Sequence, residues 1–350
     1  MLPWEIGKLT KLTLVDLSYC YSLEVISPNV LSRLSKLEEL YLYDSFDRWE
    51  VEGHEIFEKP RANASLVELQ HLSHLTSLEL HIPNEQAVPK DLFSEKLERY
   101  KISIGEKWRP WQYDVLETSR NLKLKLNQSI HLYDIGVTTL LRKTETLYLD
   151  AVKVGMNIVY DPNTEGLSHL KHFRVSNDSE AVYIINSMKS VSCETFPLLE
   201  SLILENLINL EAICYGQLKA QYFGQLRIIN VRQCKMLKNL FSFSIGSRVD
   251  QLQEIEVYDC ENFTGLLVEK RGEDIGEDIL EFSQLSSLKL RDLPSFIGSI
   301  YSEKKLSSSQ PGSIQSIDAR SNATSLFDQK VFMSIYFFFR LNSWFQHISF

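Results

Sequence analysis

One short phrase recurs along the 350-residue chain and constrains its fold more than any other feature. Each copy holds an apolar residue, two variable residues and a Leu, as in residues 9–12 (LTKL). Two more apolar residues follow that Leu at offsets of three and five, as Val15 and Leu17 do. Side chains two residues apart on an extended strand share a face, so each copy predicts a short strand with one apolar side. A single copy cannot cover that side, and successive copies must therefore stack.

Eight copies of the phrase keep the same internal spacing, and three less regular ones lie between them. The eight pairs of strand residues are Val15/Leu17, Leu40/Leu42, Leu78/Leu80, Phe173/Val175, Leu202/Leu204, Ile229/Val231, Ile255/Val257 and Leu288/Leu290. The irregular pairs are Tyr100/Ile102, Leu122/Leu124 and Leu147/Leu149. Clean neighbours recur every 25–29 residues, which is typical of leucine-rich repeats. We predict an α/β solenoid: a leucine-rich-repeat horseshoe of about 10–11 irregular repeats, with a parallel sheet on the concave face and mostly loops and short helices on the convex face.

The repeat pattern also divides the chain. Residues 1–301 are predicted to form the solenoid, with insertions near 46–66 and 269–281. Residues 302–328 are rich in Ser and predict a disordered linker. Residues 329–350 are dense in Phe and carry no repeat spacing, so we expect a tail outside the repeat.

Composition excludes several classes of protein. The chain has 37 Lys+Arg against 46 Asp+Glu, a net charge of -9, which argues against a nucleic-acid partner. It holds no apolar stretch of about 18 residues, so no membrane span is expected. It begins without a secretory signal and has five scattered cysteines without a C-x-x-C pair, which favours a reducing, cytoplasmic location. Five N-x-[ST] sequons point weakly the other way.

Motifs for catalysis are missing as well. We find no P-loop, no G-x-G-x-x-G and no G-x-S-x-G, and therefore expect neither an enzyme nor a cofactor. His74 and His169 occupy a repeat slot that Lys or Gln fills elsewhere, which predicts exposed positions and no metal site. Cys20, Cys234 and Cys260 share another slot, in the turn after the strand, where we expect a structural role.

The surface that remains is the concave face of the predicted sheet. The residue between the two strand positions of each copy points outward there, and these residues form one predicted column. We predict a partner-binding face made of Asp16, Tyr41, Glu79, Lys101, Tyr148, Arg174, Asn230, Glu256 and Lys289, with Arg232 from a flanking column. Mixed charge with Tyr and Arg suits protein recognition. Trp108 and Trp111 are expected to pack in a convex loop or to anchor a partner.

Longer phrases resemble the repeat region of plant intracellular immune receptors, which combine a coiled-coil domain, a nucleotide-binding switch and leucine-rich repeats. The resemblance lies in residues 2–20 (LPxEIGxLTxLxxxVDLSxC), 34–41 (LSxLEELY), 64–69 (ASLxEL), 97–105 (LERYxIxIG), 144–149 (TExLYL) and 196–202 (FPxLExL). It implies a disease-resistance module that senses a pathogen effector or a guarded host protein and, in a full-length receptor, restrains the nucleotide-binding domain.

The nucleotide-binding motifs of such receptors are not found in this sequence. The switch is therefore not carried over, and we expect a truncated form that lacks the nucleotide-binding domain. Two alternatives stay open. A substrate adaptor of a ubiquitin ligase would need an F-box segment before the repeats, and an extracellular receptor-like repeat domain would need glycans on the sequons.

Overall fold

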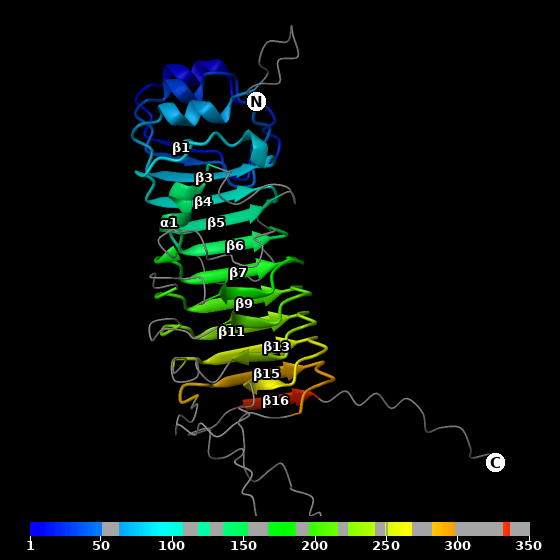
Figure 1. Cartoon of the computed structure of the whole chain (residues 1–350). Coiled ribbons are helices and arrows are strands. Elements are labelled where there is room, and N and C mark those ends of the chain that lie inside the picture. Colours follow the sequence, from blue (N-terminus) through cyan, green and yellow to red (C-terminus); the bar gives the residue numbers. More distant parts are fainter. Residues whose placement is uncertain are drawn as a thin grey trace, which may run out of the picture.

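The computed structural model describes residues 1–50, 63–107, 118–126, 136–152, 167–186, 196–215, 223–241, 249, 251–267, 282–297 and 332–336. Its main feature is a twelve-stranded parallel sheet in which the order of the strands follows the order of the chain (Figure 1). The strands are β1 (Leu14–Asp16), β2 (Glu39–Tyr41), β3 (Ser77–Ile82), β4 (Arg99–Ile104), β5 (Arg120–Lys125), β6 (Thr146–Asp150), β7 (His172–Ser176), β9 (Ser201–Glu205), β11 (Ile228–Arg232), β13 (Glu254–Tyr258), β15 (Ser287–Arg291) and β16 (Phe332–Tyr336). Each coil of the chain therefore adds one strand beside the previous one, as predicted for a leucine-rich-repeat solenoid.

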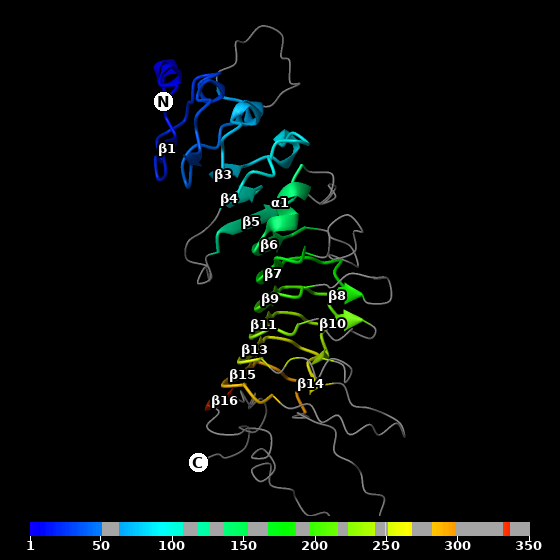
Figure 2. The same cartoon turned by 90° about the vertical axis from the view of Figure 1, so that its left-hand side faces the viewer.

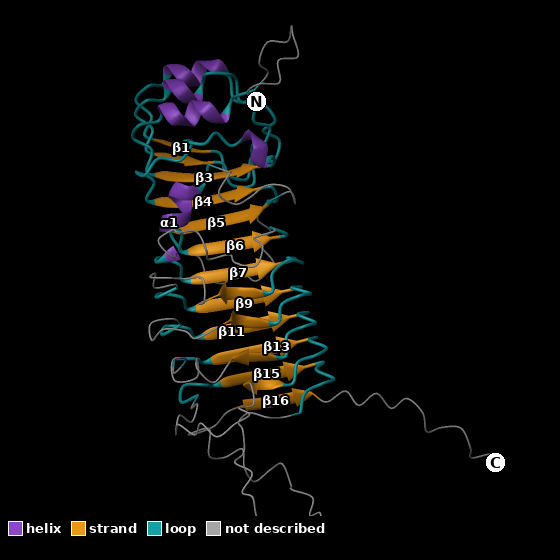
Figure 3. Ribbon diagram, in the orientation of Figure 1, coloured by secondary structure: helices purple, strands orange, loops and turns teal. Residues whose placement is uncertain are grey.

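The side opposite the sheet changes along the molecule. Its first part carries the 3-10 helices η1 (Trp4–Lys8), η2 (Leu31–Arg33), η3 (Leu66–His71) and η4 (Glu85–Ala87) and the helix α1 (Thr138–Lys143). Its second part carries two small parallel sheets, β8 (Tyr183–Asn186) with β10 (Ala212–Tyr215), and β12 (Asn239–Phe241) with β14 (Gly265–Leu267). Figure 2 shows the main sheet on the inner side of a shallow curve, and Figure 3 shows the change from helices to strands behind it. The fold class is confirmed. The small sheets were not predicted; β8 (YIIN) and β10 (AICY) carry Ile and Tyr, which favour strands, whereas β12 (NLF) and β14 (GLL) hold no β-branched residue.

Stacking buries the residues that define the repeat. Leu202, Leu204, Ile229 and Val231 are all 0% exposed, and the strand pairs from Leu40 to Leu290 lie in one continuous core. Phe side chains add to this core, and those that are fully buried are Phe46, Phe173, Phe196, Phe223, Phe241, Phe263 and Phe282. The same residues that predicted the strands therefore make the core between coils.

The turns that leave most strands of the main sheet contain one residue with a positive φ. Examples are Asn177 at 59° and Asn206 at 53°, and Gln233, Asp259 and Asp292 have similar values. The Asn177 N–H donates to the Glu205 carbonyl at 3.0 Å, so the turn is bonded to the next coil. Short amide and acid side chains tolerate this conformation better than most residues do, which explains their recurrence at the slot. Gly105 fills it at 89°, and a Cβ there would lie 1.9 Å from the Lys125 carbonyl oxygen.

The cysteines of the repeat slot behave largely as predicted. Cys234 and Cys260 are 0% exposed, and each thiol donates to the carbonyl two residues earlier at 3.4 Å. Cys20, in the first coil, is exposed. His74 and His169 are exposed, in agreement with the interpretation of their slot.

The end of the chain departs from the predicted domain boundaries. Residues 332–336, which we expected in a non-repeat tail, form β16, with Met333 opposite Leu288 and Ile335 opposite Leu290 in the register. This strand lacks the repeat phrase, because Lys330 stands where the preceding Leu would be. The predicted linker 302–328, the acidic insertion 269–281, most of the insertion 46–66, and Trp108 and Trp111 lie outside the described residues.

Candidate functional site

The outward-facing residues of the main sheet form the candidate recognition surface. In the first four strands, the predicted residues Asp16, Tyr41, Glu79 and Lys101 lie directly opposite one another in the strand register. In β6 to β15 a second aligned row holds Tyr148, Arg174, Ile203, Asn230, Glu256 and Lys289. The structure therefore places the predicted residues in two aligned rows.

These two rows do not form the single column that we predicted. Lys101 lies opposite Asn121, whereas Lys123 lies opposite both Ser103 and Tyr148. Lys101 and Lys123 hold the same place in their repeat copies, between the two apolar residues, but they do not face each other. The strand register between β4 and β5 is therefore shifted by two residues relative to the repeat pattern. A two-residue step keeps every side chain on its face of the sheet, so the outward residues stay outward.

A third apolar residue in the early strands causes the step. Ile104 continues the alternation after Ile102, and both are 0% exposed. Ile102 packs opposite Leu122 and Ile104 opposite Leu124. Pairing these buried residues keeps the core continuous, and it shifts the outward residues by two. In the sequence, Ile82 and Ile104 mark this step as a third apolar residue after the repeat pair.

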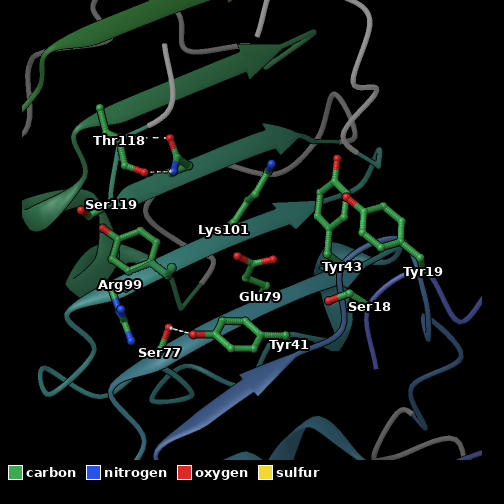
Figure 4. A pocket seen from close by; sticks show the side chains of 12 residues that line it. Ser18, Tyr19, Tyr41, Tyr43, Ser77, Glu79, Arg99, Lys101, Thr118 and Ser119 are labelled. Carbon is green, nitrogen blue, oxygen red and sulfur yellow. Dashed lines mark hydrogen bonds between the residues drawn. The ribbon is translucent and has the colours of Figure 1, made fainter. Parts of the chain in front are cut away.

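A pocket opens on the outward face over β1 to β5. Its volume is about 430 Å³. It is lined by Ser18, Tyr19, Tyr41, Tyr43, Ser77, Glu79, Arg99, Tyr100, Lys101, Thr118, Ser119 and Asn121. Figure 4 shows Tyr19 and Tyr43 on one side, Thr118 and Ser119 on the other, and Glu79 and Lys101 between them. Three of the predicted site residues, Tyr41, Glu79 and Lys101, meet here.

The aromatic side of this pocket is preorganised. The Tyr19 and Tyr43 rings meet edge to face with their centroids 5.4 Å apart. The Lys101 ammonium lies 4.3 Å from the centre of the Tyr43 ring, a cation–π contact. Tyr19 is still 58% exposed, and the neighbouring Tyr21 is 73% exposed. Tyr19 and Tyr43 come from the turns after β1 and β2, where sequence reasoning placed only a flanking column.

Hydrogen bonds fix the edge of the pocket around Tyr41. The Tyr41 hydroxyl donates to the Glu39 carboxylate and lies 3.1 Å from the Ser77 hydroxyl, while Arg99 forms an ion pair with Glu39 at 3.3 Å. Burial and the bond to Glu39 raise the pKa of Tyr41, so this hydroxyl keeps its proton at neutral pH. Behind it, the buried Tyr100 hydroxyl donates to the Leu140 carbonyl at 2.8 Å and ties β4 to α1.

The charged residues of the second row are paired across the strands. Arg174 pairs with Glu205, and its side chain is 13% exposed. Arg232 pairs with Glu256 at 3.3 Å, and Lys289 pairs with Glu254 at 2.6 Å. The predicted residues of β7 to β15 thus form a charge-balanced ladder, whereas the open pocket lies over the first strands.

Comparison with known proteins bears on this geometry. Residues 119–261, from β5 to the turn after β13, match the family model for the leucine-rich repeats of RPS2-like plant disease resistance proteins. The chain is also 25% identical over 319 residues to the disease resistance protein At4g27190 of Arabidopsis thaliana. The chain is thus similar to the leucine-rich-repeat region of plant disease resistance proteins. The match covers 84% of this chain and 30% of the relative's length.

The family model covers the strands from β5 to β13, which carry most of the paired charges, and most residues that line the pocket come before it. A second local feature lies at the carboxyl ends of β3 to β5. The segment Gly105–Lys107 crosses them, with Lys123 donating to the Lys107 carbonyl at 3.1 Å and Lys125 pairing with Glu106 at 3.0 Å. Burial opposes ionisation of Glu106, but the Lys125 bond and the two lysine charges outweigh it and lower the pKa of this carboxyl.

His81 lies beneath this segment and is 7% exposed. Its Nδ1 lies 2.9 Å from the Ser103 hydroxyl. Burial, together with the charge of Lys107, lowers the pKa of His81 to about 4. The ring is therefore neutral at pH 7 and acts as a hydrogen-bonding group within the structure.

No group of three or more His, Cys, Asp or Glu side chains in the described part of the chain is arranged to hold a metal ion. Across the same residues, no helix has the length and apolar character needed to cross a membrane.

Proposed function

We propose that this region is the recognition module of a plant innate-immune receptor and that it binds a pathogen effector or a guarded host protein on its concave face. The observation that carries the proposal is the tyrosine-lined pocket over β1 to β5. The similarity to plant disease resistance proteins supports the immune context.

The chemistry of the pocket favours a protein ligand. Tyr residues offer a large amphipathic contact area with few rotatable bonds, and they are enriched among the residues that dominate binding energy. The Tyr19–Tyr43 pair is held in place before binding, so little side-chain entropy is lost when a partner covers it. Hydroxyl groups of Tyr41 and Ser77 supply polar contacts at the edge of the aromatic surface.

The charge-paired ladder of β7 to β15 would act differently. The charged groups of the ladder are already paired with one another, so a partner gains little net binding energy by contacting them. A partner whose charges do not match those of the ladder would be repelled. We propose that this half selects among partners and that the pocket supplies most of the affinity.

The remaining parts of the proposal concern the longer receptor. There the module restrains a nucleotide-binding domain until the ligand is bound, it works in the cytoplasm, and it performs no catalysis itself. The support is the resemblance of its repeat phrases to those receptors.

A binding comparison in plant tissue tests the proposal. The region is fused to a proximity-labelling biotin ligase and expressed in leaves with and without a pathogen. A double variant, Tyr19→Ala with Tyr43→Ala, removes the aromatic side of the pocket. Tyr258→Ala, on the same face at β13 and 37% exposed, is the matched control.

The double variant should fail to label the proteins that the wild type and Tyr258→Ala both label. When such a protein is purified, the double variant should bind it at least about 30-fold more weakly than the wild type does, as expected when two anchoring tyrosines are removed. Equal labelling by all three proteins would show that the pocket is not the binding site.

A further inference from the structure

The tyrosine-lined pocket already holds a cation that belongs to the chain itself. The Lys101 ammonium lies 4.3 Å from the centre of the Tyr43 ring, although Lys101 comes from β4 and Tyr43 from the turn after β2. The lysine side chain therefore reaches back across β3. Glu79 of β3 lies opposite Lys101 in the strand register, and Figure 4 shows both side chains between the two sides of the pocket. An aromatic ring face with a carboxylate nearby is a typical environment for recognising a cation.

The aromatic surface is larger than one ammonium group can cover. Tyr19 packs edge to face against Tyr43, with ring centroids 5.4 Å apart, and is still 58% exposed. The pocket volume of about 430 Å³ lies in the range of ligand-binding pockets. A second, planar cation can therefore lie against the tyrosine pair.

The charges around the pocket favour a positively charged ligand. The outward faces of the first three strands carry the carboxylates of Asp16, Glu39 and Glu79. A hydrogen bond from the backbone N–H two residues later lowers the pKa of Asp16, so this group is ionised at neutral pH. The neighbouring cations are balanced, because Arg99 pairs with Glu39 at 3.3 Å and the lysines of β5 pair with Glu106. With a net charge of -9 on the whole chain, the field draws cations toward this face.

We propose that the pocket takes an arginine side chain from a basic segment of the protein partner, and that Lys101 occupies the site until the arginine displaces it. The inference rests on the proposed function, since it names the group that the partner places in the pocket. A guanidinium group is planar, stacks on tyrosine rings and bonds a carboxylate such as Glu79 through two parallel N–H groups. An ammonium group is a more strongly hydrated point charge. Arginine therefore gains more from these surroundings than Lys101 does, and the lysine side chain returns to water.

Substitution of Lys101 tests the proposal by the sign of its effect. The blocked tripeptides Gly-Arg-Gly and Gly-Glu-Gly are titrated into the purified chain, and saturation-transfer NMR measures their dissociation constants. Lys101→Met keeps the apolar stem of the side chain and removes its charge. Lys36→Met, at an exposed position just before β2, makes the same change away from the pocket and is the matched control. Tyr43→Ala, added to Lys101→Met, removes the ring on which the arginine stacks.

The Arg peptide should bind Lys101→Met at least about threefold more tightly than the wild type, because no internal cation competes for the Tyr43 ring. Lys36→Met should match the wild type, and the added Tyr43→Ala should remove the gain. Equal or weaker binding of the Arg peptide to Lys101→Met, or no binding to either protein, would overturn the proposal.

Tighter binding of the Glu peptide than of the Arg peptide to the wild type would overturn it as well, because Lys101 would then contact an anionic group of the partner. The outcome is separate from that of the leaf-labelling experiment. If the Tyr19→Ala, Tyr43→Ala variant loses its labelled proteins while Lys101→Met gains no affinity for the Arg peptide, the proposed function stands and only the arginine is removed from it.

Discussion

Glu68 joins two successive coils through backbone hydrogen bonds, and its replacement should weaken the first part of the solenoid. The residue lies in η3 and is 7% exposed. One carboxylate oxygen accepts from the N–H groups of Asn29 at 2.8 Å and Ser65 at 3.3 Å. The other accepts from Leu31 at 3.1 Å and Ser32 at 3.3 Å. A single side chain thus caps its own helix and the start of η2 in the preceding coil.

The size of the effect follows from which donors water can reach. Asn29 is exposed and Ser32 is half-buried, so water can replace the carboxylate at these two N–H groups. Leu31 is 0% and Ser65 3% exposed, so their N–H groups would stay without an acceptor in Glu68→Ala. A buried donor without a partner costs about 1–3 kcal/mol, and two of them predict a loss of about 2–6 kcal/mol.

Urea unfolding followed by circular dichroism measures this loss, and amide exchange at Leu31 locates it. Glu68→Gln keeps one acceptor oxygen and should fall between the wild type and Glu68→Ala. Glu38→Gln, at an exposed position just before β2, should change the free energy of unfolding by less than about 0.5 kcal/mol. If Glu68→Ala were as mild as Glu38→Gln, the carboxylate would not be bridging the two coils.

Three further predictions follow from burial, titration and pairing. Leu202→Ala should cost about 2–5 kcal/mol in urea unfolding because Leu202 is 0% exposed, while Ile203→Ala on the outward face should cost far less. The pKa of His81 is about 4 in the folded state, below its ordinary 6.5, so between these values the folded state binds fewer protons than the unfolded state. The stability that is present above pH 6.5 is therefore lost as the pH falls toward 4. The loss reaches about 3 kcal/mol, and a stability–pH curve of His81→Gln with an unchanged slope would contradict it. Arg174→Glu should destabilise the chain by about 1–2 kcal/mol by facing Glu205, and adding Glu205→Arg should restore most of the melting temperature.

The sequence was sufficient for the architecture because the repeat is a burial pattern. Pairs such as Leu202/Leu204 and Ile229/Val231 identify the strand, its inward face and its neighbour at once. The outward position of the candidate residues follows from the same alternation. Whether these residues bind a partner stays a prediction.

Other features of the structure depend on contacts between different coils, and the sequence of a single repeat does not reveal such contacts. The register step at β4–β5 depends on Ile102 and Ile104 packing against the next coil, which local spacing does not reveal. The pocket arises where Tyr19 and Tyr43, from turns in two coils, meet Lys101 from a third. The burial of His81 depends on a segment that crosses several strands. In each case the deciding partner lies in another coil.

The account depends on successive coils stacking in register so that one continuous face is presented to a partner. A pulsed electron–electron distance measurement between spin labels at Tyr41→Cys and Asn230→Cys tests this directly, with Cys20 and Cys193 changed to Ser. The two positions lie seven strand steps apart, on β2 and β11, which predicts a Cα separation of roughly 30–35 Å with a narrow distribution. A broad distribution, or a separation well below about 25 Å, would contradict the stacked solenoid.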